Sequence, residues 1–315
     1  MIVSEEAVKY LFFVDGKVRE KLSRYNEQSE GKQEHQIHDR LFKLLIHTYF
    51  EEFMELFFPK FHSDIDFTGI KPLSEEMFTD VFKGVKRQAD IVIEAKLRGE
   101  NSLIIIHVEP QSTYERNFNK RMFQYYTLLY NRYRKPILPI AVYSYDEKRD
   151  GQNSYEMFVT DFKVVSFQFL KVQLSTKNWR KFLTSDNPVA AALLSKMNYS
   201  ESERIMVIRA FFRMLIRMKL PDEESEFLMR FFEHYLKLDE KEEEQLMSNL
   251  KYTDDWEEIK KLPISWEEHG IKKGRVEGRE ETAIKLMEEG VDISLIKKVT
   301  ELSEERIKEL MEKLN

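Results

Sequence analysis

The chain contains no cysteine among its 315 residues, which excludes disulfide bonds, thiol catalysis and cysteine-based zinc sites. The Gly-x-Gly-x-x-Gly and Walker phosphate-binding patterns are both missing. No uninterrupted apolar stretch reaches the roughly 20 residues that a membrane span needs. The opening MIVSEEAVKYLFFVDG lacks the basic region of a secretory signal. We therefore expect a soluble, cytoplasmic protein with no membrane partner.

Charge is spread unevenly along a chain whose net charge is −6. Residues 81–135 carry eleven Lys and Arg against five Asp and Glu, whereas residues 221–260 carry five against fourteen. A basic segment suits a site that handles phosphate, but a solvated helix face can have the same composition. The composition therefore leaves both interpretations open for residues 81–135.

Residues 90–111 are the most informative stretch. Two apolar, β-branched runs, Ile91–Leu97 and Leu103–Val108, flank a polar break that contains Gly99, a pattern that predicts a β-hairpin. If Gly99 and Glu100 form the loop, paired positions sum to 199, so Asp90 lies opposite Glu109 and Gln111 shares their face. Such a carboxylate pair could hold Mg²⁺, which prefers oxygen ligands. The alternative is that both acids only end buried strands and are solvated there.

The remaining pattern predicts a mixed α/β domain followed by helices. We expect a helix from near His38 to before Pro59, strands at Ile65–Phe67, Ile137–Tyr145 and Val164–Leu170, a loop over 70–86, and a helix at Tyr114–Tyr133. From about residue 177 only helical patterns follow, with starts at Asn187 and at Ser200 or Ser202. The predicted organisation is an extension and polar linker (1–36), an α/β domain (37–175), a helical domain (176–262) and a helical tail (263–315). The tail is interpreted as an oligomerisation module or a helix-turn-helix-like unit.

Four segments carry a family resemblance: HDRLFKLLI, ADIVIEAK, IIIHVEPQS and RMFQYYTLLY. Together with the tail, they resemble the Rpn family of recombination-promoting nucleases, often labelled transposases of mobile elements. That family belongs to the PD-(D/E)xK phosphodiesterases, so the resemblance implies a restriction-endonuclease-like core with the order helix, three antiparallel strands, helix, strand.

The resemblance also implies roles for individual residues. Asp90 and Glu109 match the two motif acids, the carbonyl of Pro110 would be a further metal ligand, and Asp39 would border the site. Gln111 stands where the wider group has Lys, a replacement that this family shares. A neutral Gln can hydrogen-bond a water but supplies no charge. A metal ion, Lys43, Lys96 or Arg121 would then have to supply it.

The resulting hypothesis is a metal-dependent DNA endonuclease that uses Mg²⁺, Mn²⁺ or Ca²⁺. Its catalytic residues are expected to be Asp39, Asp90, Glu109 and Gln111. Side chains expected to contact DNA are Lys43, Lys83, Lys86, Arg87, Arg116, Lys120, Arg121 and Gln124. A homodimer formed through the helical half would place two sites on two strands. The rival hypothesis is a non-catalytic DNA- or protein-binding module that keeps the fold, which the missing Lys and the acidic net charge favour.

Overall fold

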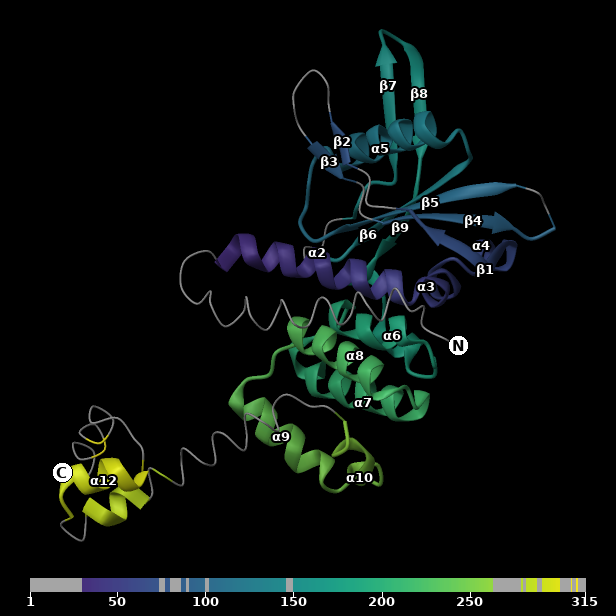
Figure 1. The fold of residues 1–315 in the computed structure, drawn as a ribbon. Coiled ribbons are helices and arrows are strands. Elements are labelled where there is room, and N and C mark those ends of the chain that lie inside the picture. Colours follow the sequence, from purple (N-terminus) through teal and green to yellow (C-terminus); the bar gives the residue numbers. More distant parts are fainter. Residues whose placement is uncertain are drawn as a thin grey trace. The chain divides into compact units, whose positions relative to one another are not determined.

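Figure 1 shows the fold in a computed structural model. The structure describes residues 30–73, 77–79, 86–88, 91–99, 102–145, 150–262, 279, 282–287, 291–300, 307 and 310. The chain divides into two compact units, Met1–Trp256 and Glu257–Asn315, which are described separately below. None of the helices in these described ranges is long and apolar enough to cross a membrane.

The first unit begins with three helices in series, α2 (Glu30–Thr48), α3 (Phe50–Phe57) and α4 (Pro59–Asp64). One continuous helix starting near His38 was predicted, and this is wrong in two respects. The helix begins earlier, because the Glu, Gln and Lys residues of the expected linker are good helix formers. It is also interrupted at Tyr49, where ψ is 47°. The predicted end before Pro59 is confirmed, since α3 ends at Phe57 and the residue before a proline disfavours the α conformation.

A mixed sheet of five strands forms the centre of this unit, with the order β1-β4-β5-β6-β9. Its strands are β1 (Ile65–Pro72), β4 (Ile91–Leu97), β5 (Leu103–Gln111), β6 (Ile137–Tyr143) and β9 (Leu170–Gln173). The first three are antiparallel, and β5, β6 and β9 are parallel. The unit is therefore a mixed α/β structure, as predicted.

The predicted register of the central hairpin is confirmed. Ile91 pairs with Val108 and Lys96 with Leu103, so each described β4–β5 pair sums to 199. Gly99 has a φ of +75°, a conformation that glycine adopts without steric cost. A one-residue slip would have moved every side chain to the other face, so the register decides which residues share a site.

Helix α5 (Phe118–Tyr133) covers one face of the sheet, and α2 packs along β5 on the other (Figure 1). Tyr125 and Leu129 of α5 form an apolar cluster with Val92 and Ile105. Odd-numbered residues of β5 therefore point toward α5, because successive side chains of a strand alternate between faces. The helix starts at Phe118 rather than at Tyr114.

The pairing of strands into two small ribbons was not predicted. Strands β2 (Met77–Thr79) and β3 (Lys86–Gln88) pair within the segment expected to be a loop. Strands β7 (Ser154–Val159) and β8 (Phe162–Gln168) form a hairpin, and β8 corresponds to the expected strand Val164–Leu170 with its bounds shifted by two residues. The fifth strand of the main sheet, β9, was not predicted as a separate strand. Only the base of the β7–β8 ribbon is covered, by Tyr155 stacking on Phe123 of α5.

After residue 177, the parts of the chain that the structure describes contain helices and no strand, as expected. Short 3₁₀ helices span Leu174–Thr176, Trp179–Phe182, Leu194–Lys196 and Glu201–Glu203, and the α-helices are α6 (Pro188–Leu193), α7 (Arg204–Met218), α8 (Asp222–Tyr235), α9 (Glu240–Leu250) and α10 (Trp256–Ile259). Asn187 caps α6 as predicted, accepting hydrogen bonds from the N–H groups of Val189 and Ala190. The α7–α8 contact is apolar, with the rings of Phe211 and Phe232 stacked 4.0 Å apart.

The second unit is small and helical where it is described. Residues 282–287 are helical, and α12 spans Ile293–Thr300. Ala283, Ile296, Ile307 and Leu310 are buried together. This agrees with a packed helical module, and the choice between oligomerisation and a helix-turn-helix function stays a prediction.

Candidate active site at the end of strand β5

Glu109 lies near the end of β5 and is almost completely buried, with 2% of its surface exposed. Its Oε1 is 2.8 Å from Nε2 of His107, which is fully buried two residues earlier on the same face. The ring of Tyr125, from α5, meets the His107 ring edge-on at 5.5 Å between centroids. Burying a charged carboxylate costs free energy unless the group is hydrogen-bonded. The contact with His107 therefore lowers the cost of burying Glu109.

Gln111 is held by protein on both ends of its amide group. Nε2 donates to the carbonyl of Thr113 at 2.6 Å, and Oε1 accepts from Nη2 of Arg121 at 2.6 Å. Each amide atom still has capacity for one further hydrogen bond. The amide is thus fixed in orientation, with a cation directly beside it.

Arg121 is anchored through three contacts. Besides Gln111, its Nη1 donates to Glu115 at 2.5 Å, and its guanidinium lies 4.9 Å from the centroid of the Phe118 ring. The side chain remains 29% exposed, so it is reachable from solvent. Of the three cations that sequence analysis offered in place of the missing lysine, Arg121 is the one that contacts Gln111. Lys96 is exposed near the opposite end of β4, and Lys43 is half-buried on α2.

Helix α2 is joined to the same end of β5 by a buried polar link. His38 Nε2 lies 2.8 Å from the hydroxyl of Ser144, and the Ser144 N–H donates to the carbonyl of Gln111 at 3.0 Å. This link brings the α2 turn that contains Asp39 to the strand end, although the Asp39 side chain is not among those described. Ser144 is only 1% exposed, so the pair is a structural cross-link and not an accessible nucleophile with its base.

Several other predicted site residues are not described by the structure, or are described only in their backbone. Asp90 and Lys83 lie outside the described residues, and for Lys86 and Arg87 the structure describes their backbone in β3 but not their side chains. Within the described ranges, no group of three His, Asp or Glu side chains forms a metal site. The confirmed register, extended by one position, still predicts Asp90 opposite Glu109.

The Glu109 carboxylate and the Pro110 carbonyl are oxygen ligands of the kind that a hard divalent cation binds. Leu97 N–H donates to the carbonyl of Ser102, which directly precedes β5, whereas Ile105 N–H donates to the carbonyl of Pro136, which precedes β6. Backbone groups alternate along a strand, so even-numbered residues of β5 direct theirs toward β4. The carbonyl of Pro110, the residue after Glu109, therefore faces the β4 side of the sheet. Carboxylate and carbonyl oxygens are ligands that Mg²⁺ accepts.

Exposed basic residues precede and follow the start of α5. Arg116 and Lys120 are exposed and form no ion pair with the described part of the chain, and Gln124 follows one turn later, half-buried. Of the residues predicted to contact DNA in this segment, Arg121 is the one with a described contact to Gln111.

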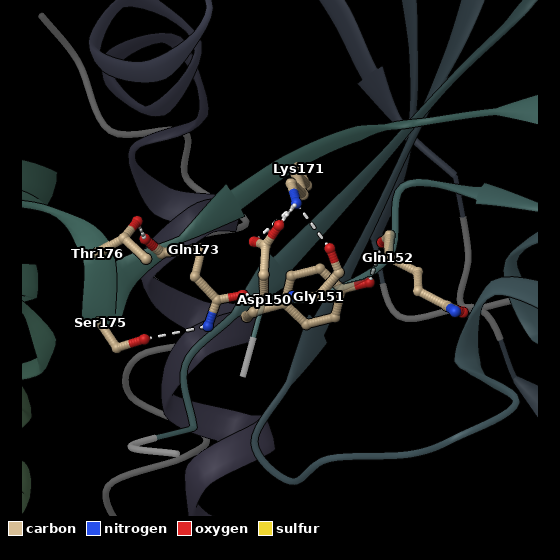
Figure 2. Close-up of polar contacts among 8 residues, drawn as sticks. Asp150, Gly151, Gln152, Lys171, Gln173, Ser175 and Thr176 are labelled. Carbon is tan, nitrogen blue, oxygen red and sulfur yellow. Dashed lines mark hydrogen bonds and ion pairs between the residues drawn. The ribbon is translucent and has the colours of Figure 1, made fainter. Parts of the chain in front are cut away.

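A polar network borders this end of the sheet (Figure 2). Gln111, Tyr143 and Gln173 are register neighbours on β5, β6 and β9. Lys171 Nζ binds both carboxylate oxygens of Asp150 at 2.8 Å and the carbonyl of Gly151 at 2.7 Å, and Gly151 N–H donates to Gln173 at 3.1 Å. These contacts hold the chain after β6 in place, and each of these polar groups has a protein partner. We regard the network as structural.

Sequence analysis missed His107 as a site residue. The signal was present, because residues two apart on a strand share a face, but His107 stands inside an apolar run that reads as core. No family model, curated protein or solved structure matches this chain.

Proposed function

We propose that this protein is a metal-dependent DNA endonuclease of the PD-(D/E)xK kind, resembling the Rpn recombination-promoting nucleases. The observation that carries the proposal is the buried Glu109 at the end of β5, with Gln111 and Arg121 on the same face. The order of helix, three antiparallel strands, helix and parallel strand supports a restriction-endonuclease-like core.

In this mechanism Asp90, Glu109 and the carbonyl of Pro110 would hold the divalent ion. A bound ion of this type supplies charge that polarises the scissile phosphate and activates a water. Gln111 orients that water through the remaining hydrogen-bonding capacity of its amide. Arg121 supplies the positive charge that offsets the charge developing on the phosphate, the part played by Lys in the wider group.

DNA is held through its phosphates, without sequence reading. Arg116 and Lys120 are exposed and close to Arg121 in the chain, so we assign them to phosphate contacts. The further residues proposed for this role are Lys43, Lys83, Lys86, Arg87 and Gln124, and Asp39 borders the site from α2.

A second candidate is a binding module without catalysis. It is favoured by one specific observation: both ends of the Gln111 amide are already engaged, by Thr113 and Arg121. In such a module the same basic surface would bind DNA, and no phosphodiester bond would be cut.

Incubation with supercoiled plasmid and Mg²⁺, Mn²⁺ or Ca²⁺ separates the two. The wild type is compared with Asp90→Ala and Glu109→Ala, and with Glu156→Ala, which removes an ion-paired carboxylate from the β7–β8 ribbon. Nicking by the wild type and Glu156→Ala alone supports the nuclease. Equal nicking by all four reveals a contaminant, and DNA binding with no nicking supports the binding module.

Thermal melting tests the metal site without DNA. An ion that binds only the folded protein stabilises it by about 2.7 kcal/mol at roughly a hundred times its Kd. Adding the ion should therefore raise the Tm of the wild type, and Asp90→Asn should abolish this rise. An unchanged wild-type Tm at millimolar metal would contradict the metal site.

A further inference from the structure

We infer that His107 is a positioning residue that orients the Glu109 carboxylate for metal binding. The inference rests on the proposed function, and it concerns a residue that the sequence pattern did not single out. His107 is 0% exposed and Glu109 is 2% exposed, so their 2.8 Å contact is shielded from water on both sides.

The location of the proton on the imidazole follows from the surroundings of its two nitrogens. Nε2 faces a carboxylate oxygen, which accepts hydrogen bonds when ionised. Nδ1 is buried and has no hydrogen-bond partner among the described residues. A proton on Nδ1 would therefore be a buried donor without an acceptor, which costs about 1–3 kcal/mol. The geometry therefore fits a proton on Nε2, which donates to Glu109.

The ring has little freedom to leave this geometry. Val92 pairs with His107 across the hairpin, and the ring of Tyr125 from α5 packs edge-on against the imidazole. Val92 and Tyr125 are themselves members of a buried apolar cluster. A side chain fixed in this way holds its hydrogen bond in one direction, so one oxygen of Glu109 is held in a fixed position.

Hydrogen-bond partners of metal-ligating carboxylates determine the ligand's orientation, and their loss typically costs 10–100-fold in metal affinity. His107 occupies that position relative to Glu109. It touches no substrate in the proposed mechanism, so its effect on cleavage runs through Glu109 alone.

Two substitutions distinguish positioning from packing. His107→Gln keeps an N–H donor at about the place of Nε2, whereas His107→Leu fills the space without a donor. His62→Gln is the matched control, because His62 forms the described His–carboxylate contact outside the site, with Glu51 at 3.7 Å. Each full-length variant is first checked for an unchanged Tm without metal.

Calorimetric titration with Mn²⁺ alone gives the decisive comparison. We expect His107→Leu to bind Mn²⁺ about 10–100-fold more weakly, with His107→Gln and His62→Gln close to the wild type. If His107→Leu binds like the wild type while Glu109→Gln does not bind, the role of His107 is overturned and the metal site stands. If the wild type itself binds no Mn²⁺, the proposed function fails together with this inference.

A spectroscopic readout needs neither metal nor activity. In ¹⁵N-histidine-labelled protein, the signals lost in His107→Gln should report a protonated Nε2 and an unprotonated Nδ1. A proton on Nδ1 with none on Nε2 would overturn the inference, because Nε2 would then have no hydrogen to donate to Glu109.

Discussion

Arg121 on helix α5 donates a 2.6 Å hydrogen bond from Nη2 to the side-chain oxygen of Gln111 on strand β5. Helix α5 thereby places the positively charged guanidinium of Arg121 beside the uncharged amide of Gln111.

This contact predicts that Arg121 matters more for turnover than for binding. Arg121→Met should lower the nicking rate at saturating DNA by roughly 100-fold, the usual effect of removing one electrostatic donor from a transition state. Arg121→Lys keeps the charge but loses the two-pronged contact with Gln111 and Glu115, so we expect an intermediate rate. Single-turnover plasmid nicking measures both, and a wild-type rate for Arg121→Met would remove Arg121 from the mechanism.

Phosphate contacts by Arg116 and Lys120 predict a defined salt dependence. Each contact with double-stranded DNA contributes about 0.9 to the slope of log K against log salt. Arg116→Gln and Lys120→Gln should each weaken binding of unrelated sequences equally and reduce the slope by about one. Fluorescence anisotropy over a salt series measures this. Lys163→Gln is the control, because Lys163 is paired with Glu156 on the β7–β8 ribbon, and an equal loss in that variant would contradict a local interface.

The predictable part of the site was the part set by local chain geometry. Glycine at position 99 and two flanking apolar runs were enough to predict the β4–β5 register, because side chains on a strand repeat every two residues. The site contacts depend on residues brought together by the fold. Arg121 was one cation among three until the packing of α5 on the sheet placed it at Gln111.

The unpredicted elements have similar causes. The β7–β8 ribbon is anchored at its base by Phe123 and Tyr126 of α5, about thirty residues earlier in the chain, and several apolar residues toward its tip stay exposed. No local pattern of burial therefore marks this pairing. In the same way, His107 became a site residue only through its distance to Glu109 and the cover from Tyr125.

Gly151 is predicted to be intolerant of any side chain. A Cβ atom there would lie 2.2 Å from Cε2 of the Tyr143 ring, so the ring or the chain must shift. We expect Gly151→Ala to lower the free energy of unfolding by about 1–3 kcal/mol, as overpacking usually does. Gly69→Ala is the control, because nothing lies within 4 Å of its Cβ position. Urea unfolding measures both, and equal midpoints would contradict the close contact.

Glu203 is predicted to make stability sensitive to acid. Hydrogen bonds from the backbone and hydroxyl of Ser200, followed by the Arg180 guanidinium, lower the pKa of Glu203 from 4.5 to about 2. Because the folded-state pKa is the lower one, its stabilising contribution is complete above pH 4.5 and is lost as the pH falls toward 2.

Glu203→Gln should therefore be less stable than the wild type near neutral pH, and the difference should shrink as the pH falls below about 4.5. Unfolding by urea at a series of pH values measures the difference directly. Glu226→Gln provides the comparison, since it removes an exposed carboxylate paired with Arg230 within α8 and leaves every helix start intact. A Glu203→Gln difference that stayed constant from neutral to acid pH would show that the Ser200 and Arg180 contacts do not hold the carboxylate in its charged form.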